Sequence, residues 1–304
     1  MLRHYQIVNN KIEETADEKS PILMSVNPDE KEKRFLIDTY CLDEHTVNSA
    51  LDPDEPARLE CEPNHIAIVF KRPKNYSGAD QLLFKATTVG VFFFGESLIV
   101  VIGEDTNLFE GKPFSKVSSP REVLLKLIYR SIFHFLEHLK IINLLSDEVE
   151  QKINRAMENR FLINLFTLQK SLVYYQNAIN SNSGLIEKVR HNSARIGFTT
   201  EETELLEDIV IENNQCYRQA EVYSNILASL MDARASIVSN NLNVLMKTLN
   251  IITISIMMPT LVVSIFSMNV KIPMAHLPFA FWAIMGLAGV AMFAFLVFWK
   301  YRKW

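Results

Sequence analysis

The chain has 304 residues, 48% of them hydrophobic and 22% charged, with a formal net charge of −4. No Asp or Glu follows Asp232, so the first 232 residues hold all 35 acids and 25 of the 31 basic residues, a formal charge of −10. The last 72 residues carry six basic residues and no acid. This distribution does not fit a chain that is soluble throughout. It indicates a water-soluble domain attached to a membrane anchor.

The cysteines and the first residues indicate the compartment. Cys41, Cys61 and Cys216 lie far apart without C-x-x-C spacing, which argues against a disulfide framework and a zinc knuckle. The opening segment MLRHYQIVNNKIEET has no apolar core of the kind that a signal peptide needs. We therefore expect reduced thiols and an N-terminal part that stays in the cytoplasm.

Residues 1–118 are predicted to form a mixed α/β domain of the cytoplasm. Alternating and apolar runs predict strands, with a hairpin turn at Gly95-Glu96 between the last two. The acidic segment 51–63 is predicted to be a solvated loop. The predicted strands are 5–8, 21–26, 34–40, 65–73, 81–94 and 97–104.

Residues 119–240 are predicted to be helical. A helix begins near Ser119, and breaks are expected near 180–184 and 197–200. A capping-box pattern at Thr199 then starts a segment without Gly or Pro until Pro259. A helix of about 60 residues is about 90 Å long, so we expect a stalk that reaches from the cytoplasmic domain into the bilayer.

The motifs of common enzymes are missing from the sequence. It has no phosphate-binding loop of the Walker type, no G-x-G-x-x-G, no G-x-S-x-G and no H-E-x-x-H. His134, Glu137 and His138 have the H-x-x-E-H spacing of inverted zinc peptidases. A third ligand is not evident and the segment reads as an amphipathic helix, so we interpret these histidines as structural. We expect neither an enzyme nor a nucleic-acid partner.

The C-terminal part predicts two membrane spans, 241–269 and 278–299. Each uncharged stretch exceeds the roughly 20 residues that a helix needs to cross the hydrocarbon. Basic residues flank the spans on one side, in the tail 300–304 and before the first span, while the loop 270–277 carries only Lys271. The positive-inside rule places both termini in the cytoplasm. We expect a multi-pass protein of the plasma (inner) membrane, in contact with lipid.

A stripe of small, polar or Met residues follows the first span in alternating steps of three and four. Such a 3.5-residue period marks a seam between helices or around a common axis. One interpretation is tight packing of membrane helices through small polar residues. The other is a water-filled pore, which requires a homo-oligomer because one stripe cannot enclose it. The stripe consists of Asp232, Ser236, Ser239, Asn243, Met246, Asn250, Thr253, Met257, Thr260, Ser264 and Ser267.

Several segments of this region resemble the CorA-type magnesium transporters. They are Asp232, Val238–Asn240, Asn243–Lys247, Pro259-Thr260 and Met268-Asn269. The order of a mixed domain, a long stalk helix, two C-terminal spans and a basic tail is similar too. The resemblance implies a homopentameric funnel with a central ion path lined by the first span. It covers about 70 residues closely, and the N-terminal part agrees only in architecture.

The resemblance also implies roles for single residues. Asn269 matches the family position whose side-chain carbonyl holds a hydrated cation. Met246, Leu249, Met257 and Thr260 match pore-lining or constricting positions. An acid of the cytoplasmic funnel corresponds to Asp232, and Asp208 aligns with a stalk acid that binds regulatory divalent cations between subunits.

Two features depart from the family pattern. Ser267 replaces the Gly of the Gly-Met-Asn signature, which adds a side chain where glycine turns freely. The outer loop has Lys271 and His276 where the family often carries an acid. Acid rings concentrate cations at a pore mouth, so their absence argues against fast magnesium uptake.

The interpretation that follows is a pentameric divalent-cation channel driven by the membrane potential, with feedback from cytosolic divalent cation. Mg²⁺ is the expected ion, with Co²⁺ or Ni²⁺ as further substrates. One alternative is a Zn²⁺-type transporter of the same superfamily. The other is a non-conducting, membrane-anchored sensor or scaffold for divalent cations.

Overall fold

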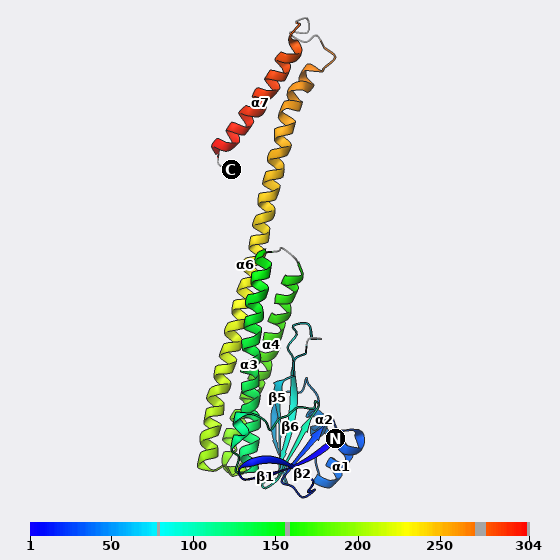
Figure 1. The fold of residues 1–304 in the computed structure, drawn as a ribbon, viewed down its shortest axis with the longest axis vertical. Coiled ribbons are helices and arrows are strands. Elements are labelled where there is room, and N and C mark those ends of the chain that lie inside the picture. The colour runs from blue at the N-terminus through cyan, green and yellow to red at the C-terminus, as the bar shows by residue number, and fades with distance from the viewer. Residues whose placement is uncertain (78–79, 156–158, 271–277, 303–304) are drawn as a thin grey trace. The chain divides into compact units, whose positions relative to one another are not determined.

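The computed structural model describes residues 1–77, 80–155, 159–270 and 278–302, and Figure 1 shows their helices and strands. It divides into two units, Met1–Met231 and Asp232–Trp304. We call them the N-terminal unit and the C-terminal unit and describe each by itself.

A mixed sheet is the centre of the N-terminal unit. Among the described residues its strand order is β2-β1-β3-β7-β6-β5-β4. Neighbouring strands are antiparallel except β3 and β7, which pair in parallel with Met24 opposite Val100. The strands are β1 (Leu2–Val8), β2 (Lys11–Thr15), β3 (Ile22–Val26), β4 (Arg58–Cys61), β5 (Ile66–Pro73), β6 (Ala86–Phe93) and β7 (Leu98–Ile102).

Helices cover both faces of this sheet (Figure 1). Leu23, Phe92 and Ile99 pack with residues of α1 (Glu30–Tyr40) and α2 (Glu44–Ser49). Their neighbours along the strands, among them Met24, Val91 and Val100, belong to the core shared with α3 (Pro120–Arg155) and α4 (Asn159–His191). Side chains alternate between the faces of a strand, so burial on both faces explains why β3, β6 and β7 are almost continuously apolar.

The predicted strand at 34–40 is wrong, because these residues lie in α1. Asp29 and Glu32 form a complete capping box: an Asp29 carboxylate oxygen accepts the Glu32 N–H at 2.8 Å, and Glu32 Oε2 accepts the Asp29 N–H at 3.2 Å. The helix also buries Leu36 completely. The capping box at the start of the helix and the packing of Leu36 thus outweigh the strand propensity of the segment Phe-Leu-Ile-Asp-Thr-Tyr.

The sequence did not predict the two edge strands, β2 and β4. The first is charged and mostly exposed, and the second lies within the acidic segment 51–63 that was expected to be a loop. Edge strands often carry charges that blunt their open side, so they lack an apolar signature. The predicted strand 81–94 is also too long, because β6 begins only at Ala86.

The long helix α6 (Thr200–Phe266) begins as predicted, after α5 (Ser193–Ile196). Gly197 ends the preceding helix with a φ of 80°, which glycine adopts without strain. The Thr199 hydroxyl accepts the Glu202 N–H at 3.2 Å, and Glu202 accepts the Thr199 N–H at 2.9 Å. The capping box is therefore confirmed.

The predicted break near 180–184 is wrong, since α4 continues through it. The polar residues there make tertiary contacts. Asn182 accepts the N–H of Lys71 and donates to its carbonyl, both at 2.8 Å. β4 pairs with β5 only as far as Val69, so the Asn182 amide takes the place of the next strand. Asn213 of α6 donates to Ser183 at 2.7 Å and fixes the same turn of α4.

The C-terminal unit contains the end of α6 and the helix α7 (Ala280–Arg302). Within the described residues, two helices, α6 and α7, are long and apolar enough to cross a membrane, and 6% of the most apolar window of each is buried. α6 continues through Pro259, and proline has no N–H to donate to the Ser255 carbonyl. Residues 271–277 of the expected outer loop and 303–304 of the expected tail lie outside the described residues.

Replacing Asn182 with Ala should destabilise the N-terminal unit. The Lys71 N–H would lose its partner inside the core, while the Lys71 carbonyl keeps the Ser131 hydroxyl at 3.0 Å. One buried unpaired donor costs about 1–3 kcal/mol. Thermal unfolding of the purified chain measures this, with Asn180→Ala, exposed on the same helix, as control. Equal midpoints for both variants would contradict the role of Asn182.

Candidate functional site

The predicted stripe lies in the C-terminal unit, along α6 and just beyond its end. Every predicted pore residue is exposed in the single chain, including apolar residues such as Met257 at 61%. From Thr253 onward, this polar and Met-rich face thus has no cover from within the described part of its own chain. The predicted pore residues are Asn243, Met246, Leu249, Asn250, Thr253, Met257, Thr260, Ser264, Ser267, Met268 and Asn269.

The other side of α6 is partly covered. Ile251, Met258 and Val262 are half-buried, and Ser255 is only 8% exposed. The matching small residue of α7 is Ala288, which is 3% exposed. Small residues let membrane helices approach closely, which indicates that α7 packs on this side.

The two sides are nearly opposite. Successive residues of a helix are about 100° apart, so Thr253, Met257 and Thr260 lie within about 40° of the direction opposite Ser255. From Thr253 onward the stripe therefore faces away from α7. A face that α7 does not cover is free to meet other copies of the chain or water.

The beginning of the stripe lies beside α7 instead. Asn243, Met246 and Asn250 line an open groove of about 850 Å³ whose other wall includes Trp299 and Arg302. The sequence pattern did not predict this groove. The basic residues that flank the spans could have indicated the groove, because Lys247 and Arg302 both line it.

Two threonine hydroxyl groups of the stripe can act as hydrogen-bond acceptors. Thr253 Oγ1 donates to the Leu249 carbonyl at 2.9 Å, and Thr260 Oγ1 donates to the Ile256 carbonyl at 2.7 Å. Each hydroxyl hydrogen is thereby occupied, and the oxygen lone pairs remain free. The water shell of a cation presents hydrogens outward, so these oxygens match a hydrated cation without carrying a charge.

The Ser-Met-Asn segment follows the end of the helix at Phe266. The Ser267 N–H and hydroxyl both donate to the Ser264 carbonyl, at 3.2 Å and 3.0 Å. Ser267 is not among the described residues with a positive φ. The backbone therefore does not need glycine here, and the added hydroxyl folds back onto the last turn. The side chains of Met268 and Asn269 are exposed beyond it.

The two predicted acids lie in different units. Asp232 is exposed at the start of the C-terminal unit, and Asp208 is exposed on α6 of the N-terminal unit. Burial raises the pKa of Tyr129 in α3, and the nearby charges of Glu212 and Asp208 raise it further. The described residues contain no group of three or more His, Cys, Asp or Glu that could hold a metal ion.

The two histidines of the H-x-x-E-H pattern are packed in the core. Their rings lie 4.4 Å apart, and His138 Nδ1 lies 2.6 Å from the Tyr175 hydroxyl. Burial lowers the pKa of His138 to about 4. Burial, with the charges of His138, Arg72 and Arg130, lowers that of His134 to about 3. Glu137 is exposed, and across the described residues these side chains belong to no metal-binding group.

Comparisons with known proteins identify the family and the fold of the chain. A family model described as "CorA-like Mg2+ transporter protein" matches residues 21–303. The cobalt/magnesium transport protein CorA of Methanocaldococcus jannaschii is 24% identical over 98% of this chain and 96% of its own. The complete structure of the CorA magnesium transporter from that organism matches with a TM-score of 0.83, at 18% identity, over 98% of this chain and 96% of its own.

Two further solved structures share the fold. The full-length CmaX protein matches with a TM-score of 0.76 at 14% identity. The match covers all of this chain and 98% of the CmaX chain. The cytoplasmic domain of ZntB from Vibrio parahaemolyticus has a TM-score of 0.61 at 12% identity, over 79% of this chain and 98% of its own.

A mixed-sheet unit, a very long helix and an apolar C-terminal helix are the architecture that this chain shares with the full-length CorA structure. The chain belongs to the CorA-like Mg2+ transporter family. The resemblance seen in the sequence is thereby confirmed, and so is the fold class of its single chain. Members of this family are transporters rather than enzymes.

Acid should destabilise the N-terminal unit through its buried histidines. A His whose pKa is lowered on folding contributes stability above its unfolded pKa of about 6.5, and this is lost as pH falls through the folded value. We expect the thermal midpoint of unfolding to decrease as the pH is lowered from about 6.5 to about 4, the pKa of His138 in the folded protein. His138→Gln keeps a partner for Tyr175 but does not titrate.

The comparison of this variant with the wild type tests the assignment. His138→Gln should flatten the decline in thermal midpoint with pH, and the exposed His191→Gln should leave it unchanged. An equally steep decline in His138→Gln would show that His138 does not cause it.

Proposed function

We propose that the chain forms a homopentameric channel for divalent cations, with Mg²⁺ as the principal ion. The observation that carries this proposal is the exposed, acceptor-lined face of α6 opposite its α7-facing side. An inside-negative potential contributes roughly 2.3 kcal/mol per charge per 100 mV and would drive uptake. This requires the arrangement expected from the basic residues, an inner-membrane protein with both termini in the cytoplasm.

The oligomer follows from the cost of leaving that face in lipid. Polar side chains inside a membrane face a bundle interior or a water-filled cavity. Identical copies arranged around one axis would bring Thr253, Thr260 and Ser264 of every chain to the same path. Five copies is the number that the family resemblance implies.

Neutral acceptors suit magnesium in particular. Mg²⁺ gives up its waters reluctantly and usually keeps several of them. The oxygens of Thr253 and Thr260 and the amides of Asn250 and Asn269 can bind the water shell. Conduction needs binding that is weak enough for the ion to leave, which a ring of carboxylates would hinder.

The path has three proposed parts. Ser267, Met268 and Asn269 form the outer entrance, where an amide is the strongest neutral acceptor. Met246, Leu249 and Met257 form a hydrophobic neck that gates by losing water. Asn243 and Asp232 lie at the cytoplasmic side and lead into an acidic funnel.

Direct measurement of flux identifies which divalent cation the chain transports. The curated relative is named for cobalt and magnesium, which supports Co²⁺ as a second substrate. Zn²⁺ transport is an alternative, and Ni²⁺ is a further candidate substrate. A non-conducting sensor or scaffold is the other alternative. Flux into liposomes separates it from a transporter directly.

Feedback by the cation is the second part of the proposal. The first 232 residues carry −10 per chain, so five copies bring about −50 together. Such repulsion opposes a compact ring. Divalent cations bound at Asp208 between subunits would offset it, so high internal cation favours a closed ring.

The entrance is tested by Asn269→Ala. Loss of the amide from every subunit removes several acceptors for one hydrated ion, so uptake of Mg²⁺ into liposomes should fall at least about tenfold. Asn225→Ala, exposed on α6 in the N-terminal unit, serves as control. Undiminished uptake with an intact oligomer would remove Asn269 from the mechanism.

The feedback is tested by protease protection. Mg²⁺ should slow cleavage of the N-terminal part of α6 in the wild-type oligomer and protect Asp208→Ala much less. The control is Glu204→Ala, an exposed acid one turn earlier. Equal protection of the wild type and Asp208→Ala would exclude Asp208 as the sensor. Protection of neither would contradict the feedback.

A further inference from the structure

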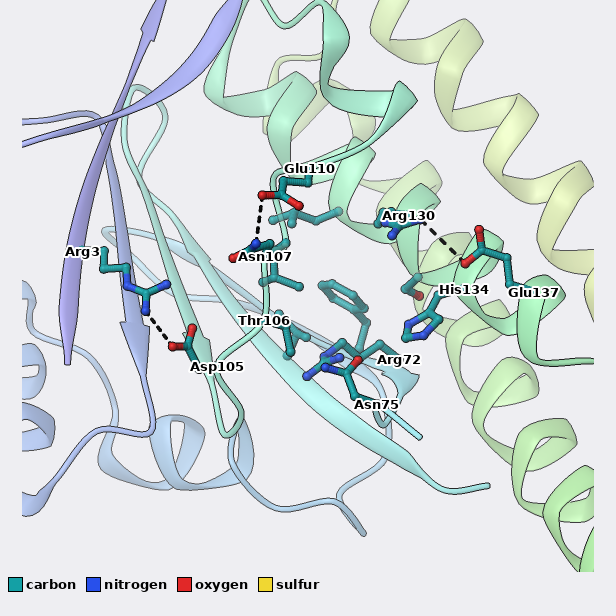
Figure 2. A pocket seen from close by; sticks show the side chains of 15 residues that line it. Arg3, Arg72, Asn75, Asp105, Thr106, Asn107, Glu110, Arg130, His134 and Glu137 are labelled. Atoms are coloured by element: carbon teal, nitrogen blue, oxygen red, sulfur yellow. Dashed lines mark hydrogen bonds and ion pairs between the residues drawn. The ribbon is translucent and has the colours of Figure 1, made fainter. Parts of the chain in front are cut away.

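A cavity of about 540 Å³ lies within the N-terminal unit, far along the sequence from the stripe. It lies between the end of β5, the segment that follows β7, and α3 (Figure 2). None of its residues belongs to a site that we have assigned to ion transport. The residues that line it are Arg3, Phe70, Arg72, Asn75, Val89, Asp105, Thr106, Asn107, Leu108, Glu110, Leu127, Arg130, Ser131, His134 and Glu137.

The most unusual of these residues is Arg72, a guanidinium that is only 4% exposed. Its terminal nitrogens donate to the Pro73 carbonyl and to Glu104 Oε2, both at 3.2 Å. Its Nε is buried and has no partner among the described groups. A buried donor of a charged group without a partner is costly, so it points to a ligand.

The charge of Arg72 is only partly balanced. The Glu104 carboxylate also pairs with Lys74 at 3.5 Å, so one acid is shared between two cations. Arg72 therefore shares its carboxylate partner with a second cation. A positively charged group with an unused donor favours an anion.

Other donors surround the same space. The Thr106 hydroxyl is also buried without a partner among the described groups. Figure 2 shows Thr106, Arg72 and His134 around the cavity, with Arg130 one turn before His134 on α3. Arg130 reaches Glu137 only at 3.9 Å, which is too long for a hydrogen bond. Its guanidinium is therefore available to a ligand.

The acids of the cavity lie at its rim. Asp105 and Glu137 have side chains that are 59% and 57% exposed. Asp105 is paired with Arg3 at 2.7 Å, and Glu110 accepts the Asn107 amide at 2.9 Å. The carboxylates thus point to solvent or have partners, while the unpartnered donors lie inside. No metal-binding group of three ligands occurs here among the described residues.

We propose that this cavity binds a phosphate group through Arg72, Thr106 and Arg130. A tetrahedral oxyanion can accept from donors that arrive from the strand, the segment after β7 and the helix at once. The volume exceeds that of one phosphate and lies in the range of small-molecule sites. The floor includes the apolar residues Phe70, Leu108 and Leu127, which suit an organic part of the ligand.

The consequence is a ligand input to the N-terminal unit that is separate from the divalent cation. The phosphate group would connect β5 with α3 and the segment after β7. It would therefore raise the free energy of unfolding with the logarithm of one plus the ratio of its concentration to its dissociation constant. This inference does not depend on the proposed pore.

The test is a titration of the full-length purified chain with two probes, inorganic phosphate and adenosine monophosphate, followed by calorimetry and by the thermal midpoint. Binding of either probe is expected. Tighter binding of adenosine monophosphate identifies an organic phosphate, and tighter binding of inorganic phosphate identifies the free ion. The proposal is overturned if neither probe binds at millimolar concentration.

Variants locate the site. Arg130→Gln and Thr106→Val should each weaken binding about tenfold, as expected for a lost hydrogen bond to a charged group. Glu137→Gln removes the acid nearest to Arg130 and should strengthen binding several-fold, which a general loss of stability cannot produce. Arg190→Gln, a cation of α4 outside the cavity that pairs with Glu187 at 2.6 Å, is the control. Equal affinities in all four variants would place binding elsewhere and overturn the assignment.

Discussion

A polar helix face cannot lie against hydrocarbon, and this constraint governs the C-terminal unit. Unpaired polar groups cost several kcal/mol each in an apolar medium, so the exposed stripe of α6 needs water or another protein surface. From Thr253 onward α7 does not supply that surface, because it packs on the side of Ser255. The hydroxyl hydrogens of Thr253 and Thr260 are donated to carbonyls of the same helix, which leaves the hydroxyl oxygens as acceptors on this face.

The N-terminal unit meets a different requirement, that of holding one end of α6 in place. Its sheet is buried on both faces, and polar side chains such as Asn182 and Asn213 fix α4 against the sheet and α6. The same packing holds Arg72 beside a cavity, and the Nε of Arg72 has no hydrogen-bond partner among the described groups. The proposed ligand site would make this unit more than a support for the apolar helices.

The sequence predicted those features whose cause is local or periodic. The long helix, its capping box at Thr199 and the two apolar spans follow from patterns within one segment. The sequence failed where a tertiary contact decides, as at residues 34–40, where Leu36 packs on the sheet, and at Asn182, whose partner is 111 residues away. The Arg72 cavity was missed for the same reason, because an arginine in an apolar strand carries no sign of the loop and helix that surround it.

The central claim is that the face of α6 opposite Ser255 lines an aqueous path. A chain without its native cysteines, carrying either Thr253→Cys or Thr260→Cys, can be treated in liposomes with a positively charged, water-soluble thiosulfonate. Ser255→Cys and Val262→Cys, on the side that packs with α7, are the matched positions. The account predicts rapid modification and block of cation flux at the first two positions and slow modification without block at the others. The reverse pattern, or modification at equal rates on both sides, would contradict it.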